Sequence, residues 1–67
     1  MRYKFTKEES EALRELSIPF DPFSDLSEDE ELLLLDIVDE AASYAGYDTP
    51  KGDLYTDILD SMAKQAE

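Results

Sequence analysis

Residues 27–46 have the sequence SEDEELLLLDIVDEAASYAG, and this stretch decides the fold of the chain. Ser27 and Glu30 match a capping box, in which the hydroxyl accepts from the third helical amide and the carboxylate reaches back to the cap amide. Gly46 supplies the left-handed stop that ends many helices. The stretch therefore predicts a long helix over residues 28–45.

The apolar side chains of this predicted helix cover a wide arc of its surface. At 100° per residue the arc spans about 200°, and it consists of Leu33, Leu34, Leu35, Ile37, Val38, Ala41, Ala42, Tyr44 and Ala45. An arc this wide needs two neighbours to cover it. We therefore predict that this helix lies at the centre of the fold.

A shorter helix is predicted before it. Thr6 and Glu9 form a second capping box, so a helix should begin at Lys7, with Glu9 placed on the apolar face only because the cap needs it. Proline disfavours helical geometry in the residue before it. With a proline at position 19, we expect this helix to end near residue 16 or 17.

A third helix is predicted after the long one. Thr49 can cap it, and Pro50 suits a first helical position, so the helix should run from residue 50 or 53 to Ala66. Its apolar residues recur at helical spacing, and acids occupy the opposite side. The apolar set is Leu54, Tyr55, Ile58, Leu59, Met62, Ala63 and Ala66.

Two segments outside these helices are expected to pack on the core. Residues 2–5 alternate polar and apolar side chains, which predicts a short extended arm that lays Tyr3 and Phe5 on the core. Residues 18–23 are too rich in proline for a helix and too apolar for a free linker. The predicted fold is all-α: a single domain of residues 1–67 forming a three-helix bundle with a short extended N-terminal arm.

Composition argues against catalysis. The chain has 67 residues, no Cys and no His, so it lacks the usual nucleophiles, zinc ligands and neutral-pH general base. A chain this short cannot enclose a substrate in a cleft. The acids at residues 21–31 lack the glycine and the spacing of a calcium loop. We therefore expect no enzyme activity, no cofactor and no metal.

Charge indicates what kind of partner the chain can have. It carries 6 Lys+Arg against 18 Asp+Glu, a net charge of −12, which disfavours nucleic acid and anionic membranes. No apolar run approaches the ~20 residues that span a bilayer. We expect a soluble, cytoplasmic protein that is monomeric because two such copies repel, and whose partner is a protein with a basic surface.

Leu32 is the residue that breaks the pattern, because it lies at the centre of the polar arc of the long helix. The N-terminal arm or the proline-rich connector could cover it, it could be a lone exposed leucine, or it could contact a partner. Around it lies an acidic row that consists of Asp29, Asp36, Asp39 and Glu40.

These five residues are the predicted partner-binding site. The acidic row is also what an ordinary solubilising surface looks like. The function that we favour is a non-catalytic protein–protein interaction module, an adaptor or regulatory subunit with an acidic helical surface. The alternative is a nucleic-acid mimic that inhibits a DNA- or RNA-binding protein, since rows of fixed negative charge can imitate a phosphate backbone.

Overall fold

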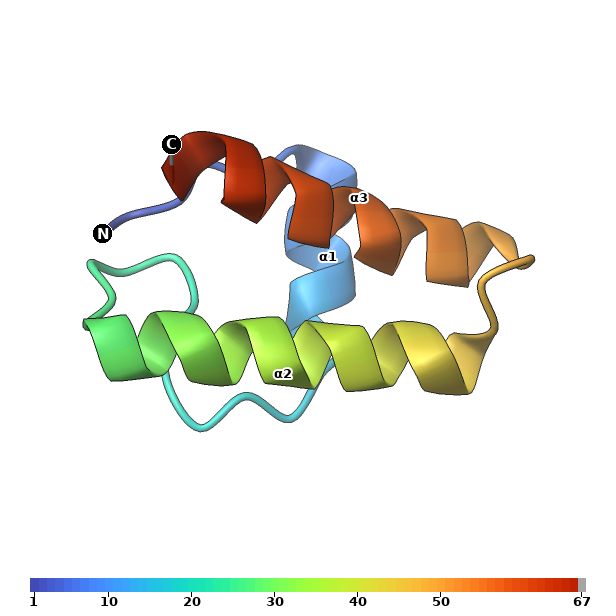
Figure 1. The fold of residues 1–67 in the computed structure, drawn as a ribbon, viewed down its shortest axis with the longest axis horizontal. Helices are drawn as coiled ribbons and strands as arrows, with labels where there is room; N and C mark the ends of the chain where they lie inside the picture. Colours follow the sequence, from blue (N-terminus) through green and yellow to red (C-terminus); the bar gives the residue numbers. More distant parts are fainter. Residues whose placement is uncertain (67) are drawn as a thin grey trace.

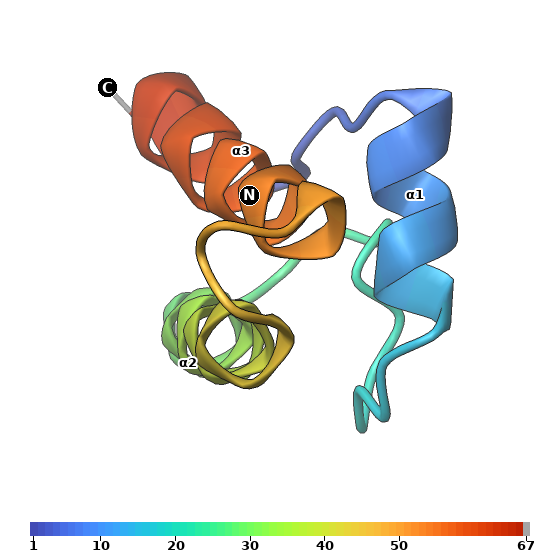
Figure 2. The ribbon, with the colours of Figure 1, turned by 90° about the vertical axis from the view of Figure 1, so that its right-hand side faces the viewer.

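The computed structural model describes residues 1–66 of the chain. Helix α1 spans Lys7–Arg14, α2 spans Glu28–Ala45 and α3 spans Pro50–Ala66. Figure 1 shows α2 and α3 side by side and antiparallel, with the short α1 crossing them, and Figure 2 shows that α1 lies in a separate layer behind this pair. The predicted all-α class with three helices is confirmed, and residues 1–66 contain no strand.

The capping boxes set the starts of α1 and α2 as predicted. Thr6 Oγ1 accepts from the Glu9 amide at 3.1 Å, and Glu9 Oε1 accepts from the Thr6 amide at 2.8 Å. Ser27 and Glu30 make the same reciprocal pair at 3.2 and 2.9 Å. Each box satisfies two backbone groups that a helix start otherwise leaves unpaired, so both helices begin at the predicted residue.

Helix α1 ends at Arg14, two to three residues earlier than predicted. The amides of Glu15 and Leu16 bond to carbonyls three residues back, at 3.2 and 3.1 Å, which is the tightened geometry of a 3₁₀ turn. The chain then leaves the helix axis before it reaches Ser17. Helix α1 thus ends before the residue that Pro19 constrains, and Leu16 lies outside it.

The joint between α2 and α3 contains both glycines of the chain. Gly46 has φ 89° and ψ 126°, so its φ is positive as predicted but its ψ is more extended than in a left-handed helix. Thr49 Oγ1 accepts from the Gly52 amide at 3.0 Å and donates to the Gly46 carbonyl at 2.7 Å. This pairing caps α3 and starts it at Pro50.

Gly52 lies directly against the backbone of Gly46. A Cβ atom at position 52 would overlap the Gly46 carbonyl oxygen and lie 2.7 Å from the carbonyl carbon, closer than such atoms approach in proteins. The end of α2 and the start of α3 are therefore held at a separation that only glycine at position 52 allows.

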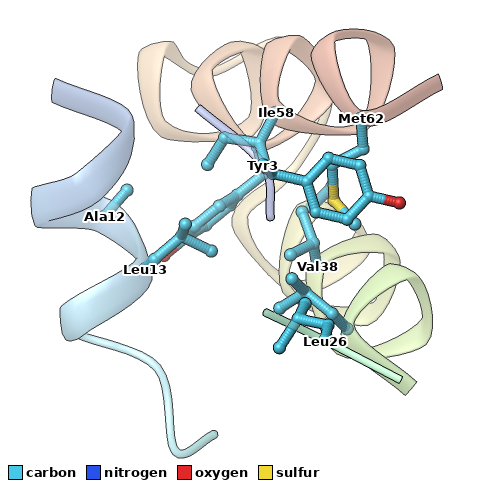
Figure 3. Close-up of a cluster of buried hydrophobic side chains, with 10 residues drawn as sticks. Tyr3, Ala12, Leu13, Leu26, Val38, Ile58 and Met62 are labelled. Atoms are coloured by element: carbon cyan, nitrogen blue, oxygen red, sulfur yellow. The ribbon is translucent and has the colours of Figure 1, made fainter. Parts of the chain in front are cut away.

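The core lies between the α2–α3 pair and α1, where Ala12 and Leu13 of α1 point toward Val38 and Ile58 (Figure 3). Helix α3 packs against both other helices, whereas α1 and α2 touch each other little. The prediction that the long helix lies at the centre is therefore wrong, since α3 holds that place. The buried apolar residues are Tyr3, Ala12, Leu13, Leu26, Leu34, Val38, Ala42, Tyr55, Ile58 and Met62.

The N-terminal segment is the extended arm that its alternation predicts. Tyr3 is buried, and its hydroxyl donates to Glu31 Oε1 at 3.0 Å. Burial raises the pKa of the Tyr3 phenol, and the hydrogen bond to Glu31 raises it further by a smaller amount. The Lys4 backbone exchanges two hydrogen bonds with the side-chain amide of Gln65, at 2.6 and 2.8 Å. The arm thus joins the end of α3 to the start of α2.

The connector between α1 and α2 packs on the core, as predicted. Pro22 and Leu26 are buried, and the Phe23 ring meets the Phe5 ring edge-on with centroids 6.1 Å apart. The Arg14 guanidinium lies over the Phe23 ring, 5.4 Å from its centroid. These contacts fix the connector beside α1, away from the outer face of α2.

Candidate functional site

Leu32 remains exposed to solvent, with 57% of its surface accessible. The arm instead reaches the neighbouring Glu31 through Tyr3, and the connector packs on Phe5 and Arg14. Helical geometry explains why Leu32 is exposed, because it lies about 120° around α2 from the buried Val38. The possibility that the arm or the connector covers Leu32 is therefore wrong.

The acidic row lies around Leu32 on the same face of α2. Asp29, Asp36, Asp39 and Glu40 are all exposed, and they extend over about 16 Å of helix axis at 1.5 Å per residue. Each of them lies three or four residues from Leu32 or from another acid of the row, the spacing at which side chains on a helix are neighbours. The structure thus brings the five predicted residues together as one apolar side chain inside a charged surround.

The electrostatics of this face are dominated by carboxylates. Residues 15–50 contain eleven Asp and Glu and no Lys or Arg. The next basic residue, Lys51, forms an ion pair with Glu15, and this hydrogen bond raises the pKa of the Lys51 ammonium. Helix α2 therefore carries no cation of its own to neutralise the acidic row.

Two further apolar residues of α2 are exposed although the apolar arc placed them in the core. Leu33 has 42% of its surface accessible and Tyr44 has 84%. Helix α3 covers the side of α2 that carries Leu34, Val38 and Ala42, and no second helix within the described residues 1–66 covers the rest. The wide apolar arc of α2 therefore indicates a partly exposed face, and it does not indicate that α2 lies at the centre of the fold.

That open face forms one side of a groove that sequence reasoning missed. Leu16 and Ser17, in the turn after α1, face the middle of α2 across an open space of about 460 Å³. The α2 wall of the groove consists of Ile37, Glu40, Ala41 and Tyr44. Glu40 thus belongs both to the acidic row and to the groove, so the two features are continuous. The signal in the sequence was the width of the apolar arc itself.

Other kinds of site find no support within residues 1–66. No group of three or more Asp and Glu side chains in this range is arranged to hold a metal ion. Over the same residues, no helix combines the length and the apolar character needed to cross a membrane. Comparison with models of protein families, with curated proteins and with solved structures finds no match.

Proposed function

We propose that the chain is a non-catalytic protein–protein interaction module that presents the outer face of α2 to a partner with a basic surface. The observation that carries this proposal is the exposure of Leu32 within the acidic row. Protein interfaces commonly place an apolar anchor inside a polar or charged rim, and the anchor supplies most of the binding energy. This face of α2 has that arrangement.

Charge supports a basic partner. The eleven acids of residues 15–50 produce a field that attracts Lys- and Arg-rich surfaces and repels acidic ones. Such a field mainly accelerates association and selects the partner, whereas the apolar anchor slows dissociation. The two parts of the surface thus have separable effects that an experiment can measure.

Nucleic-acid mimicry would use the same surface differently. A mimic competes for a basic groove through its carboxylates alone and has no use for the exposed side chains of Leu32, Leu33 and Tyr44. Its binding should fall steeply with salt, as binding of DNA itself does. An interaction module should retain much of its affinity at high salt through its apolar contacts.

Capture of partners from the native lysate can separate these functions when the wild type and its variants are compared in parallel. The immobilised proteins are the wild type, Leu32→Ser, and a triple variant with Asp36→Asn, Asp39→Asn and Glu40→Gln. A matched control carries Asp57→Asn and Asp60→Asn on α3, both exposed and outside the proposed surface. Partners are eluted with a NaCl gradient, and a recovered partner is purified for measurement of its binding kinetics.

We expect Leu32→Ser to keep its melting temperature, because the side chain is largely in solvent. Its affinity for the partner should fall by about 1 to 2 kcal/mol through faster dissociation. The triple variant should associate more slowly, and the α3 control should bind as wild type. A partner that ignores Leu32→Ser, is lost with the triple variant and elutes at low salt would instead establish mimicry.

A further inference from the structure

An apolar strip along α2 has no partner in the fold. Ile37, Ala41 and Tyr44 line the groove, and Leu33 continues the strip one helical turn toward the start of α2. Helix α1 does not cover the strip because it ends at Arg14 and turns away. Among residues 1–66, only Leu16 and Ser17 face it from the other side, so the groove is open toward solvent.

We propose that this groove binds an amphipathic helix whose apolar stripe is flanked by Lys and Arg. This inference rests on the proposed function, because it names the chemistry of the partner for the side of α2 that adjoins the acidic row at Glu40. The strip from Leu33 to Tyr44 extends over about 16 Å, which corresponds to three turns of a bound helix. The shape and the charge of the groove each support this occupant.

Shape supports a helix over other ligands. The walls of the groove are α2, whose backbone groups bond within the helix, and the turn after α1, so an extended peptide would find no strand edge to pair with. A helix satisfies its own backbone and needs only an apolar surface with helical spacing. Small-molecule sites bury most of their ligand, whereas this groove is open toward solvent.

Charge supports a basic helix over a second copy of the chain. Glu40 stands in the groove wall, and Asp36 lies one turn away on the same side of α2. Glu15 precedes the groove residue Leu16 in the chain and is paired with Lys51. Two copies of the chain would bring −12 each to the interface, whereas Lys and Arg flanking an apolar stripe would meet the unpaired carboxylates.

The test uses a designed peptide probe. It is a helix of about 14 residues, roughly four turns, made of Leu and Lys with the leucines on one face, capped at both ends and labelled with fluorescein. The matched control peptide has the same composition with its leucines distributed around the helix. Fluorescence anisotropy in about 150 mM NaCl, where long-range attraction is screened, gives the affinity of each peptide for the full chain.

Two pairs of protein variants locate the bound peptide. Tyr44→Ser removes an exposed groove residue, and Tyr47→Ser removes an exposed tyrosine outside the groove. Glu40→Gln removes a groove carboxylate, and Asp57→Asn removes an equally exposed one on α3. We expect about tenfold weaker binding with Tyr44→Ser, a larger loss than most interface residues give, a several-fold loss with Glu40→Gln, and changes within twofold for both controls.

Equal affinity for the two peptides would overturn the inference, because binding would then follow net charge alone. Equal effects of Tyr44→Ser and Tyr47→Ser would overturn it as well. Amide chemical shifts in ¹⁵N spectra give an independent measurement that does not depend on a variant, since perturbations should centre on the residues that line the groove. If the peptide does not bind the groove but a captured native partner depends on Leu32, only the groove inference fails and the proposed function stands. If the peptide binds the groove but no captured partner depends on Leu32, the proposed function fails and the groove remains a peptide-binding site.

Discussion

Gly52→Ala should destabilise the chain although it places a better helix former inside a helix. In an ordinary helix interior this exchange stabilises by up to about 1 kcal/mol. Here the new Cβ atom would overlap the Gly46 carbonyl oxygen and lie 3.2 Å from Thr49 Oγ1. The end of α2 and the start of α3 would have to separate by more than an ångström.

The magnitude follows from the contacts that this separation disrupts. Thr49 Oγ1 accepts a hydrogen bond from the Gly52 amide, and the Ala45 and Gly46 carbonyls share its single proton. The accepted bond and the shared donation contribute about 0.5 to 1.5 kcal/mol each, so their loss costs up to about 3 kcal/mol and outweighs the gain in helix propensity. We expect a net loss of about 2 kcal/mol, a large share of the stability of so small a domain.

Urea unfolding followed by circular dichroism at 222 nm measures this loss directly. The matched control is Asp57→Ala, an exposed position in the interior of the same helix, which should be neutral or slightly stabilising. A Gly52→Ala protein that is as stable as the Asp57→Ala protein would show that the joint can open freely and that the close approach of the two glycines does not matter.

The remaining predictions concern the core, the termini and the net charge. Leu34→Ala should cost about 2 to 4 kcal/mol in the same urea assay because the side chain is fully buried. The Met1 ammonium pairs with Asp25, and their hydrogen bond raises the pKa of the amine above 8.0 and lowers that of the carboxyl below 3.8. The contribution of this pair to stability should therefore be complete at about pH 5 to 7, and it should be lost as the pH falls through the folded pKa of Asp25 or rises through that of the amine; Asp25→Asn should flatten both limbs of a plot of urea midpoint against pH. The melting temperature should rise between about 20 mM and 500 mM NaCl as salt screens the repulsion among the acids, and a flat profile would show that repulsion does not limit stability. Light scattering at micromolar concentration should give the 7.6 kDa mass of a monomer, and twice that mass would contradict this expectation.

Local features of the sequence were the reliable guides to the fold. The capping boxes at Thr6 and Ser27 place the starts of α1 and α2 to the residue, and α3 begins at Pro50, the first of its two predicted starts. Their hydrogen bonds close within four residues, so they form whatever the rest of the chain does. The end of α1 was less predictable because no glycine or proline lies at residues 14–16, and Pro19 constrains only the residue before it.

The arrangement of the helices depended on contacts that no local pattern reports. The apolar arc of α2 correctly marks Leu34, Val38 and Ala42 as core, yet the same arc includes Leu33 and Tyr44, which the fold leaves exposed. An arc predicts which residues favour burial, but a chain with only three helices does not provide enough surface to cover it. Whether a neighbour is present is a property of the whole fold.

One part of the candidate site could be predicted from the sequence, and the other part could not. The exposure of Leu32 and the position of the acidic row around it follow from the periodicity of a single helix, so the spacing of residues in the sequence is enough to locate them. The groove needs Leu16 from outside the helix, and its position depends on where α1 stops. A surface made by two segments that are distant in sequence is therefore visible only once both are placed.

The joint of the two glycines also gives the chain a searchable signature. Gly46 is needed for its dihedral angles, Gly52 for its proximity, and Thr49 and Pro50 for the start of α3. These four requirements are independent of the surface and of most of the core, so a distant relative could exchange nearly every other side chain and keep them. The spacing Gly-x-x-Thr-Pro-x-Gly between two amphipathic helices is thus the pattern by which descendants of the same ancestor could be found after overall sequence similarity has disappeared.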